Sequence, residues 1–145
     1  MPDKFNFTQQ NGFTLIELMI VIMIIGVLAA LVMPRLSGRT EQARTSAAEA
    51  DIFSNIPLAL DLYELDNDNF PTTEQGLNAL VTKSTIPPLP KNWNGPYLKK
   101  IPLDPWMHPY NYTSPGTHNN DDYDLSSRGR DGIEGGGDDI ANWEQ

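Results

Sequence analysis

Acidic side chains offer this sequence its clearest chemistry, and eight of them fall within residues 121–145. Only Arg128 and Arg130 oppose them, so this segment carries a charge of −6 out of −9 for the whole chain. Calcium prefers about six to eight oxygen ligands, both carboxylate and carbonyl, and clustered glycines allow the tight turns that aim carbonyls inward. The pattern therefore raises the hypothesis of a hard-cation site built on three aspartates: Asp131, Asp138 and Asp139.

The same segment has a plainer interpretation as a disordered acidic tail, which its composition alone favours. Ile133, Ile140 and Trp143 oppose it, because apolar side chains can anchor the segment to a core. The residues fit neither an EF-hand nor a repeat-type calcium roll. Spacing alone leaves a metal site and a solvated loop as equal alternatives. We expect three further acids to be solvated: Asp121, Asp122 and Glu134.

A lone carboxylate stands near the other end of the chain. Glu17 is the only ionisable residue in an apolar run over residues 13–33. A helix of this length rises ~31 Å, about the thickness of a bilayer's hydrocarbon core. A charge there is costly unless it has a partner. Cleavage after Gly12 would create an amine on Phe13, one helical turn away, and the amine of a neighbouring subunit could pair with Glu17.

Two simpler interpretations of this region exist. Glu17 could be a tolerated acid that reaches the lipid headgroups. The run could also be a discarded signal peptide, but that would have a basic start and a shorter apolar core. Here the leader offers only Lys4, offset by Asp3.

The residues from Gly12 to Leu18 (GFTLIEL), with the apolar run that follows, resemble the type III signal of the type IV pilin superfamily. The resemblance implies a leader, residues 1–12, that a prepilin peptidase cuts from Phe13, and N-methylation of the new terminus. It also implies that Glu17 guides each subunit into a helical filament, and that residues 13–33 form a membrane-spanning assembly helix.

Beyond the apolar run, near-helical spacing of apolar residues predicts an amphipathic helical stem over residues 34–65. Pro34 and Pro57 predict kinks or local unwinding, because proline lacks the backbone donor. The expected apolar and small-residue positions of this stem are Leu36, Ala43, Ala47, Ala50, Ile56, Leu60 and Tyr63. The remaining residues, 66–145, predict a globular head.

Within the head, residues 73–81 predict a short helix, with Thr72 or Thr73 as its cap. Residues 110–113 and 123–126 predict strands of a small antiparallel sheet packed on the stem. The fold class is therefore α+β. Since a head of this size without cysteine buries limited surface, a structural metal would be a natural supplement.

The head is similar, in order and spacing, to the major pseudopilin family of type II secretion. Four segments carry the similarity: residues 61–66 (DLYELD), 70–80 (FPTTEQGLNAL), 104–106 (DPW) and 109–110 (PY). The similarity implies that calcium binds the side chains of Asp131, Asp138 and Asp139. Backbone carbonyls near Arg128 and Ile133 complete the implied ligand set.

These resemblances imply a single-pass protein of the bacterial inner membrane with its C-terminal head in the periplasm. It would polymerise with itself into a pseudopilus that helps export folded proteins across the outer membrane. The implied partners are minor pseudopilins, inner-membrane assembly proteins and the prepilin peptidase. The alternatives are a type IV pilin of an adhesion or motility filament and an anchored calcium-binding module that does not polymerise.

Composition excludes other classes of function. A net charge of −9 argues against nucleic-acid binding, which needs clustered Lys and Arg. Without cysteine, and with His108 and His118 in loops, the chain lacks zinc and nucleophile motifs. We expect every acid to lie in an exposed loop or cap, without the apolar pocket that a catalytic carboxyl needs. The chain is therefore expected not to be an enzyme.

Overall fold

The computed structural model describes residues 12–143, apart from the side chains of residues 31–37. The predicted leader, residues 1–12, thus lies outside the described part except for Gly12. The chain divides into two compact units, Met1–Thr40 and Glu41–Gln145, which are described separately below. The predicted boundaries between membrane helix and stem, at 33/34, and between stem and head, at 65/66, concern membrane insertion and export. They stay predictions.

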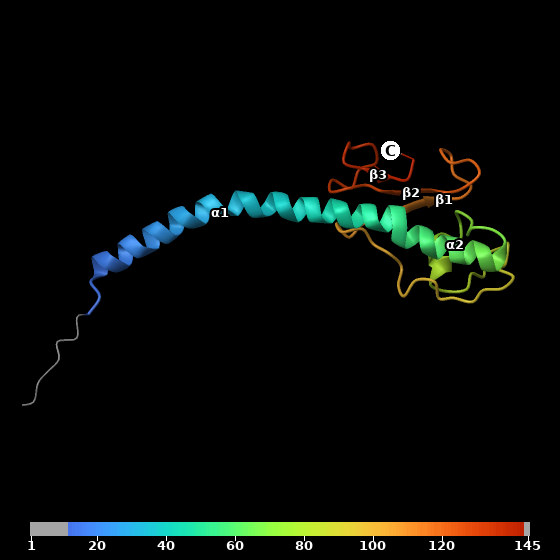
Figure 1. The fold of residues 1–145 in the computed structure, drawn as a ribbon, viewed down its shortest axis with the longest axis horizontal. Helices are drawn as coiled ribbons and strands as arrows, with labels where there is room; N and C mark the ends of the chain where they lie inside the picture. The colour runs from blue at the N-terminus through green and yellow to red at the C-terminus, as the bar shows by residue number, and fades with distance from the viewer. Residues whose placement is uncertain (1–11, 144–145) are drawn as a thin grey trace, which may run out of the picture. The chain divides into compact units, whose positions relative to one another are not determined.

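The first unit contains most of helix α1 (Leu15–Ala50), which starts after three residues without regular secondary structure (Figure 1). All of its described apolar side chains from Leu15 to Leu28 are exposed. A helix that is apolar on every side requires a non-aqueous environment or neighbours. Among the described residues, no helix combines the length and apolar character needed to cross a membrane. The predicted span, 13–33, runs into the undescribed side chains.

A π-helical turn, η1 (Asp51–Asn55), joins α1 to α2 (Ile56–Asn67). It ends two residues before Pro57, so the predicted local unwinding there is confirmed. The backbone N–H of Ile56 donates to the carbonyl of Asp51, five residues back. This wider turn accommodates one extra residue immediately before the position where proline removes a donor.

The π turn also changes which face of the helix is buried. The prediction for Ile56, Leu60 and Tyr63 is confirmed, since all three lie in the core. The small-residue positions Ala43, Ala47 and Ala50 of the predicted stem do not continue this buried face, because all three are exposed. An extra residue in the turn shifts the helical phase. The buried positions before Ile56 are therefore Ala48 and Ile52.

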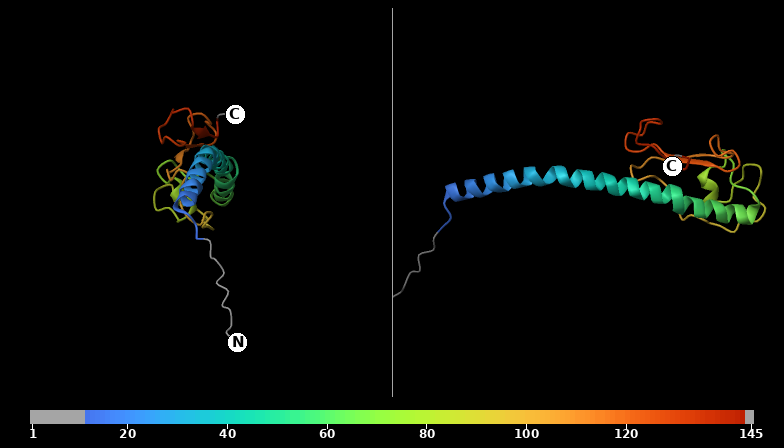
Figure 2. Two further views of the ribbon diagram at one scale, coloured as in Figure 1. Left: turned by 90° about the vertical axis from the view of Figure 1, so that its left-hand side faces the viewer. Right: turned by 45° about the horizontal axis from the view of Figure 1, so that its top comes forward.

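The head contains a three-stranded antiparallel sheet in the order β1 (Asn111–Thr113), β2 (Asp124–Ser127) and β3 (Ile140–Ala141). In the register, Tyr112 pairs with Leu125 and Ser127 pairs with Ile140. The two predicted strands are confirmed to within one residue, whereas β3 was not expected. Figures 1 and 2 show the sheet alongside the helical segment of this unit, where β2 contacts η1.

The predicted helix over residues 73–81 is shorter than expected. Only a 3-10 turn, η2 (Leu77–Leu80), forms, because Gly76 adopts a φ of +56° that an α-helix does not allow. The predicted cap at Thr72 or Thr73 is wrong for η2, whose N-cap is Gly76 without a side-chain hydrogen bond; Thr72 instead closes the turn that precedes η2. The Thr72 hydroxyl accepts the N–H of Gln75 at 3.3 Å, and the Thr72 N–H donates to the Gln75 side chain at 3.0 Å.

The core of the head joins the helical segment to the loops and the sheet. Ile52 and Leu60 pack with residues of η2 and β2, including Leu80 and Leu125, all with no exposed surface. Of the predicted anchors in the acidic segment, Ile140 packs against this core. Ile133 does not, since 64% of it is exposed.

Candidate functional site

The predicted processing junction lies at the start of the described chain. Phe13 is 82% exposed, and Thr14 and Glu17 form a reciprocal cap on α1. The Thr14 backbone N–H and hydroxyl donate to Oε2 of Glu17 at 2.9 and 3.0 Å, and the Glu17 N–H donates back to the hydroxyl at 3.3 Å. Within residues 12–143, no basic group pairs with Glu17. Oε2 of Glu17 caps the helix, and Oε1 accepts no hydrogen bond among the described residues.

Residues 128–139, here called the glycine loop, contain the three predicted metal-binding aspartates. Their carboxylates turn back onto the loop's own backbone. Asp138 accepts the N–H groups of Arg130 and Asp131 at 2.7 and 3.2 Å. Asp131 accepts the N–H of Ile133 at 2.8 Å, and Asp139 accepts that of Gly135. The loop is thus an ordered turn and not a disordered tail.

Two glycines allow this close approach of backbone and carboxylate. Gly129 has a φ of +61°, and a Cβ there would lie 2.7 Å from Oδ2 of Asp138. The backbone at Gly136 runs directly against the Asp131 carboxyl group, so a side chain at Gly136 would collide with it. Glycine is needed at both positions for the carboxylates to fold inward.

The residues present fit a hard cation in their chemistry. All the predicted ligands are oxygens, and Oδ1 of Asp139 is buried without a hydrogen-bond donor. Burial raises the pKa of Asp138, but the backbone N–H donors of Asp131 and Arg130 outweigh it and hold that pKa below its usual range, which favours the charged form. The side chains do not converge fully. Over the described residues, no three acidic or histidine side chains form a group close enough to hold a metal.

The predicted solvated acids, Asp121, Asp122 and Glu134, are exposed as expected. The expectation that every acid lies in an exposed loop or cap is wrong for two aspartates, Asp104 and Asp124, which are only 2% and 5% exposed. Both are surrounded by hydrogen-bond donors that the sequence did not predict. Two signals in the sequence could have indicated burial. Asp104 begins an Asp-Pro-Trp turn, and Asp124 lies in a predicted strand between the apolar residues Tyr123 and Leu125.

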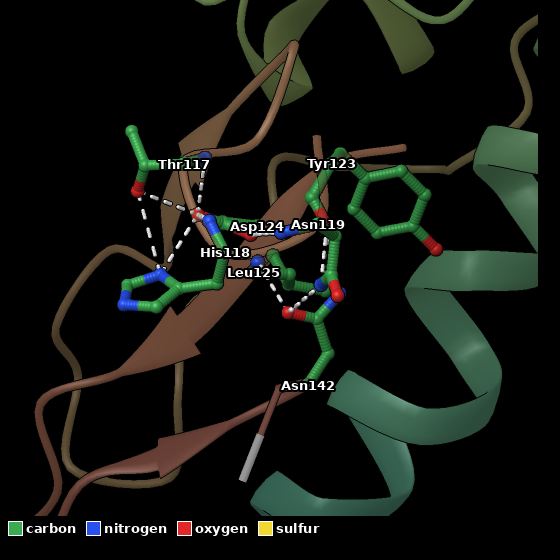
Figure 3. A network of polar contacts seen from close by, with 7 residues as sticks. All are labelled: Thr117, His118, Asn119, Tyr123, Asp124, Leu125 and Asn142. Carbon is green, nitrogen blue, oxygen red and sulfur yellow. Dashed lines mark hydrogen bonds and ion pairs between the residues drawn. The ribbon is translucent and has the colours of Figure 1, made fainter. Parts of the chain in front are cut away.

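Asp124 lies at the start of β2 and is enclosed by the residues that precede it (Figure 3). Residues 116–124 are here called the Asp124 loop. Its Oδ2 accepts the N–H of Thr117 at 2.7 Å and that of His118 at 2.9 Å. Its Oδ1 accepts the N–H of Asn119 at 3.0 Å. The Thr117 hydroxyl and Nδ1 of His118 lie 2.9 and 3.0 Å from Oδ2. Burial raises the pKa of Asp124, but these donors together hold it well below its usual range.

Asp104 makes a second network of this kind. Its Oδ1 accepts the N–H groups of Trp106 and His108 at 3.0 and 2.7 Å. Its Oδ2 accepts the hydroxyl of Ser127 at 2.6 Å. The Trp106 indole donates to Glu41 at 2.8 Å, which attaches this turn to the end of α1 within the same unit.

Neither histidine is arranged for catalysis. Ser127, Asp104 and His108 are the residue types of a hydrolase triad, but the serine donates to the aspartate rather than to the histidine, so no base activates it. His118 stacks on Trp143 with ring centroids 4.2 Å apart and pairs with Asp124. Both histidines therefore belong to structural networks.

Comparison with known proteins identifies the family. A family model described as "Type II secretion system (T2SS), protein G" matches residues 35–143, and one described as "Prokaryotic N-terminal methylation motif" matches residues 7–33. The type II secretion system core protein G of Pseudomonas aeruginosa is 54% identical over 140 residues, covering 94% of this chain and 96% of that protein. The protein of the same name from Escherichia coli K12 is 51% identical, covering 93% and 92%.

A solved structure gives the same answer for the fold. The crystal structure of the major pseudopilin from the type 2 secretion system of enterohaemorrhagic Escherichia coli aligns with a TM-score of 0.65 at 39% identity. It covers 77% of this chain and 96% of that one. The helices and small antiparallel sheet described above agree with that fold. The chain therefore belongs to the type II secretion system protein G family, the family of the major pseudopilin.

Proposed function

We propose that this pseudopilin polymerises into the periplasmic pseudopilus of a type II secretion system and helps to export folded proteins across the outer membrane. The observation that carries the proposal is the pairing of an N-terminal methylation motif over residues 7–33 with a protein G head over residues 35–143. As a pseudopilin, the chain is a structural subunit and not an enzyme. Minor pseudopilins and inner-membrane assembly proteins are its proposed partners.

Processing and membrane insertion follow from the same motif. A prepilin peptidase cuts between Gly12 and Phe13, and the new N-terminus is methylated. Residues 13–33 then span the inner membrane, residues 34–65 form the stem, and residues 66–145 form the periplasmic head. Mass spectrometry of the mature protein tests this directly. A mature chain that begins at N-methylated Phe13 is expected, and an intact residue 1 would contradict it.

Glu17 acts as the assembly residue in this proposal. Its Oε2 already caps α1 through Thr14, which lowers the cost of a carboxylate near the helix start. The methylated amine of a neighbouring subunit pairs with the remaining oxygen. Glu17→Ala is expected to abolish pseudopili while the processed subunit still accumulates in the inner membrane. The matched control is Glu49→Ala, an exposed acid farther along α1. Normal pseudopili from Glu17→Ala would refute the role.

Calcium is the proposed ligand of the glycine loop. Asp131, Asp138 and Asp139 would hold it with carbonyls near Arg128 and Ile133, and the cation would neutralise the carboxylates that this short loop carries. Support comes from the buried, unpaired oxygen of Asp139 and from the glycines that let the carboxylates fold inward. Calcium supplies no reaction here, only structural stabilisation.

The test uses the full chain in detergent micelles, melted with calcium and with EDTA. Calcium at a hundredfold excess over its Kd is expected to add about 2.7 kcal/mol of stability by mass action. Asp131→Ala and Asp138→Ala should remove the calcium response, whereas the exposed neighbour variant Glu134→Ala should keep it. A wild-type melt that calcium does not change would refute the site.

A further inference from the structure

The glycine loop begins at a corner that is fixed from outside the loop. Ser127, the last residue of β2, donates its hydroxyl to the buried carboxylate of Asp104 at 2.6 Å. The same hydroxyl oxygen accepts the N–H of Gly129 at 3.2 Å. Gly129 is the residue whose backbone lies against Asp138. One chain of contacts thus leads from Asp104 to a predicted metal ligand.

A second arm from Asp104 reaches the middle of the loop. Its Oδ1 holds the backbone N–H of His108, and Nδ1 of that ring lies 3.6 Å from Oδ2. The His108 ring packs against Gly132, where an added Cβ would lie only 3.1 Å from Cε1. Asp104 therefore fixes Gly129 through Ser127 and braces Gly132 through His108. These two glycines flank Asp131.

The side chain of Asp104 has no exposed surface, and its oxygens accept three hydrogen bonds from protein groups. A buried, fully paired carboxylate is rigid, because any movement would leave a charge without donors. A loop of five glycines has little rigidity of its own, so its carboxylates need external support to hold ligand geometry.

We propose that Asp104 is a positioning residue for the cation of the glycine loop, acting through Ser127 and His108 without touching the cation. This inference rests on the proposed calcium site. The Asp-Pro-Trp turn would then set the calcium affinity of a loop that lies more than twenty residues away in the sequence.

The experiment measures calcium binding by titration calorimetry on the full chain in detergent micelles. Ser127→Ala is expected to weaken calcium binding about tenfold, because a hydrogen bond to a buried charge is lost. Ser127→Thr keeps the hydroxyl and should bind like the wild type. Ser126→Ala is the matched control, since this neighbouring β2 hydroxyl makes no hydrogen bond among the described residues. Asp104→Asn should weaken binding as Ser127→Ala does.

The outcomes separate the two proposals. One outcome would overturn the positioning role alone: the wild type binds calcium, Asp138→Ala does not, and Ser127→Ala binds it as the wild type does. A wild type that binds no calcium would overturn the calcium site itself. A Ser127→Ala protein with a lower Tm in EDTA but an unchanged Kd would show a merely structural role and would also overturn the inference. Faster amide exchange at Gly129 in Ser127→Ala, restored in Ser127→Thr, is the expected independent signature.

Discussion

The two acidic loops of the head organise their carboxylates in opposite ways. In the Asp124 loop, a single buried carboxylate meets donors from Thr117, His118 and Asn119, so both of its oxygens are satisfied by protein (Figure 3). In the glycine loop, three carboxylates share a few backbone N–H groups, and Oδ1 of Asp139 is buried without any donor.

The difference teaches what each loop requires for stability. The Asp124 loop is complete once the chain folds, because the protein supplies every donor. The glycine loop carries three carboxylates on one short segment with few donors, so a bound cation would lower its free energy. Sequence composition does not separate these cases, since both loops are acidic and polar. The distinction lies in how many N–H groups the backbone turns toward each carboxylate.

The largest effect is expected from Asp124→Ala. The substitution removes a buried carboxylate that accepts from Thr117, His118 and Asn119, and the loss of such a network costs about 3 kcal/mol or more. Thermal unfolding with calcium and with EDTA should show an equally large loss of stability in both conditions. The exposed variant Asp121→Ala serves as the control and should melt like the wild type. A loss seen only in EDTA would mean that the two loops are not independent.

The second prediction compares one glycine from each loop. A Cβ at Gly116 would lie 2.5 Å from Oδ1 of Asp124, and one at Gly136 would collide with the Asp131 carboxyl group. Gly116→Ala should therefore destabilise the head by about 1–3 kcal/mol whether or not calcium is present. Gly136→Ala should chiefly weaken calcium binding, with little change of Tm in EDTA. Equal behaviour of the two variants would break the comparison.

The third prediction concerns acid. Because the pKa of Asp124 is lower in the folded state than in the unfolded chain, its stabilisation is complete above about pH 5. It is lost as the pH falls below about 4 toward the folded-state pKa. In calcium-free buffer, the wild type should therefore lose stability more steeply than Asp124→Asn between pH 5 and pH 3. Parallel pH profiles of the two proteins would argue that donors do not hold this carboxylate ionised.

Much of the fold was predictable because its signals are local. The strands around Tyr112 and Leu125 alternate apolar or aromatic with polar residues in the sequence, and Pro57 indicates a break in the helix. The phase of the buried face before the break was not predictable. It depends on a π turn, and no residue type in Asp51–Asn55 distinguishes that turn from an α-helix before the chain packs.

The metal-binding role of the candidate residues stays a prediction, and the contacts that support their loop could not be predicted from the sequence. Glycine spacing and acidic pairs indicated Asp131 and Asp138, whereas the turn that holds their loop lies at Asp104, far away in sequence. Contacts of this range arise only from tertiary packing, which places Ser127 beside Asp104. Ile133 shows the converse error, because an apolar residue in a short loop is not necessarily an anchor.

The smallest effect is expected from salt. Without calcium, the carboxylates of the glycine loop repel one another and are partly exposed to solvent, so sodium chloride should screen their repulsion. The Debye length falls from about 30 Å at 0.01 M salt to about 10 Å at 0.1 M. The wild type in EDTA should gain roughly 0.5 kcal/mol or less over this range, in keeping with weak surface electrostatics. Saturating calcium should remove the gain, and Asp131→Ala should reduce it. Since the carboxylate of Asp124 is already saturated with donors, Asp124→Asn should retain the full salt response. If sodium chloride reproduced the whole stabilisation given by calcium, the loop would be a screened cluster of charges and not a cation site.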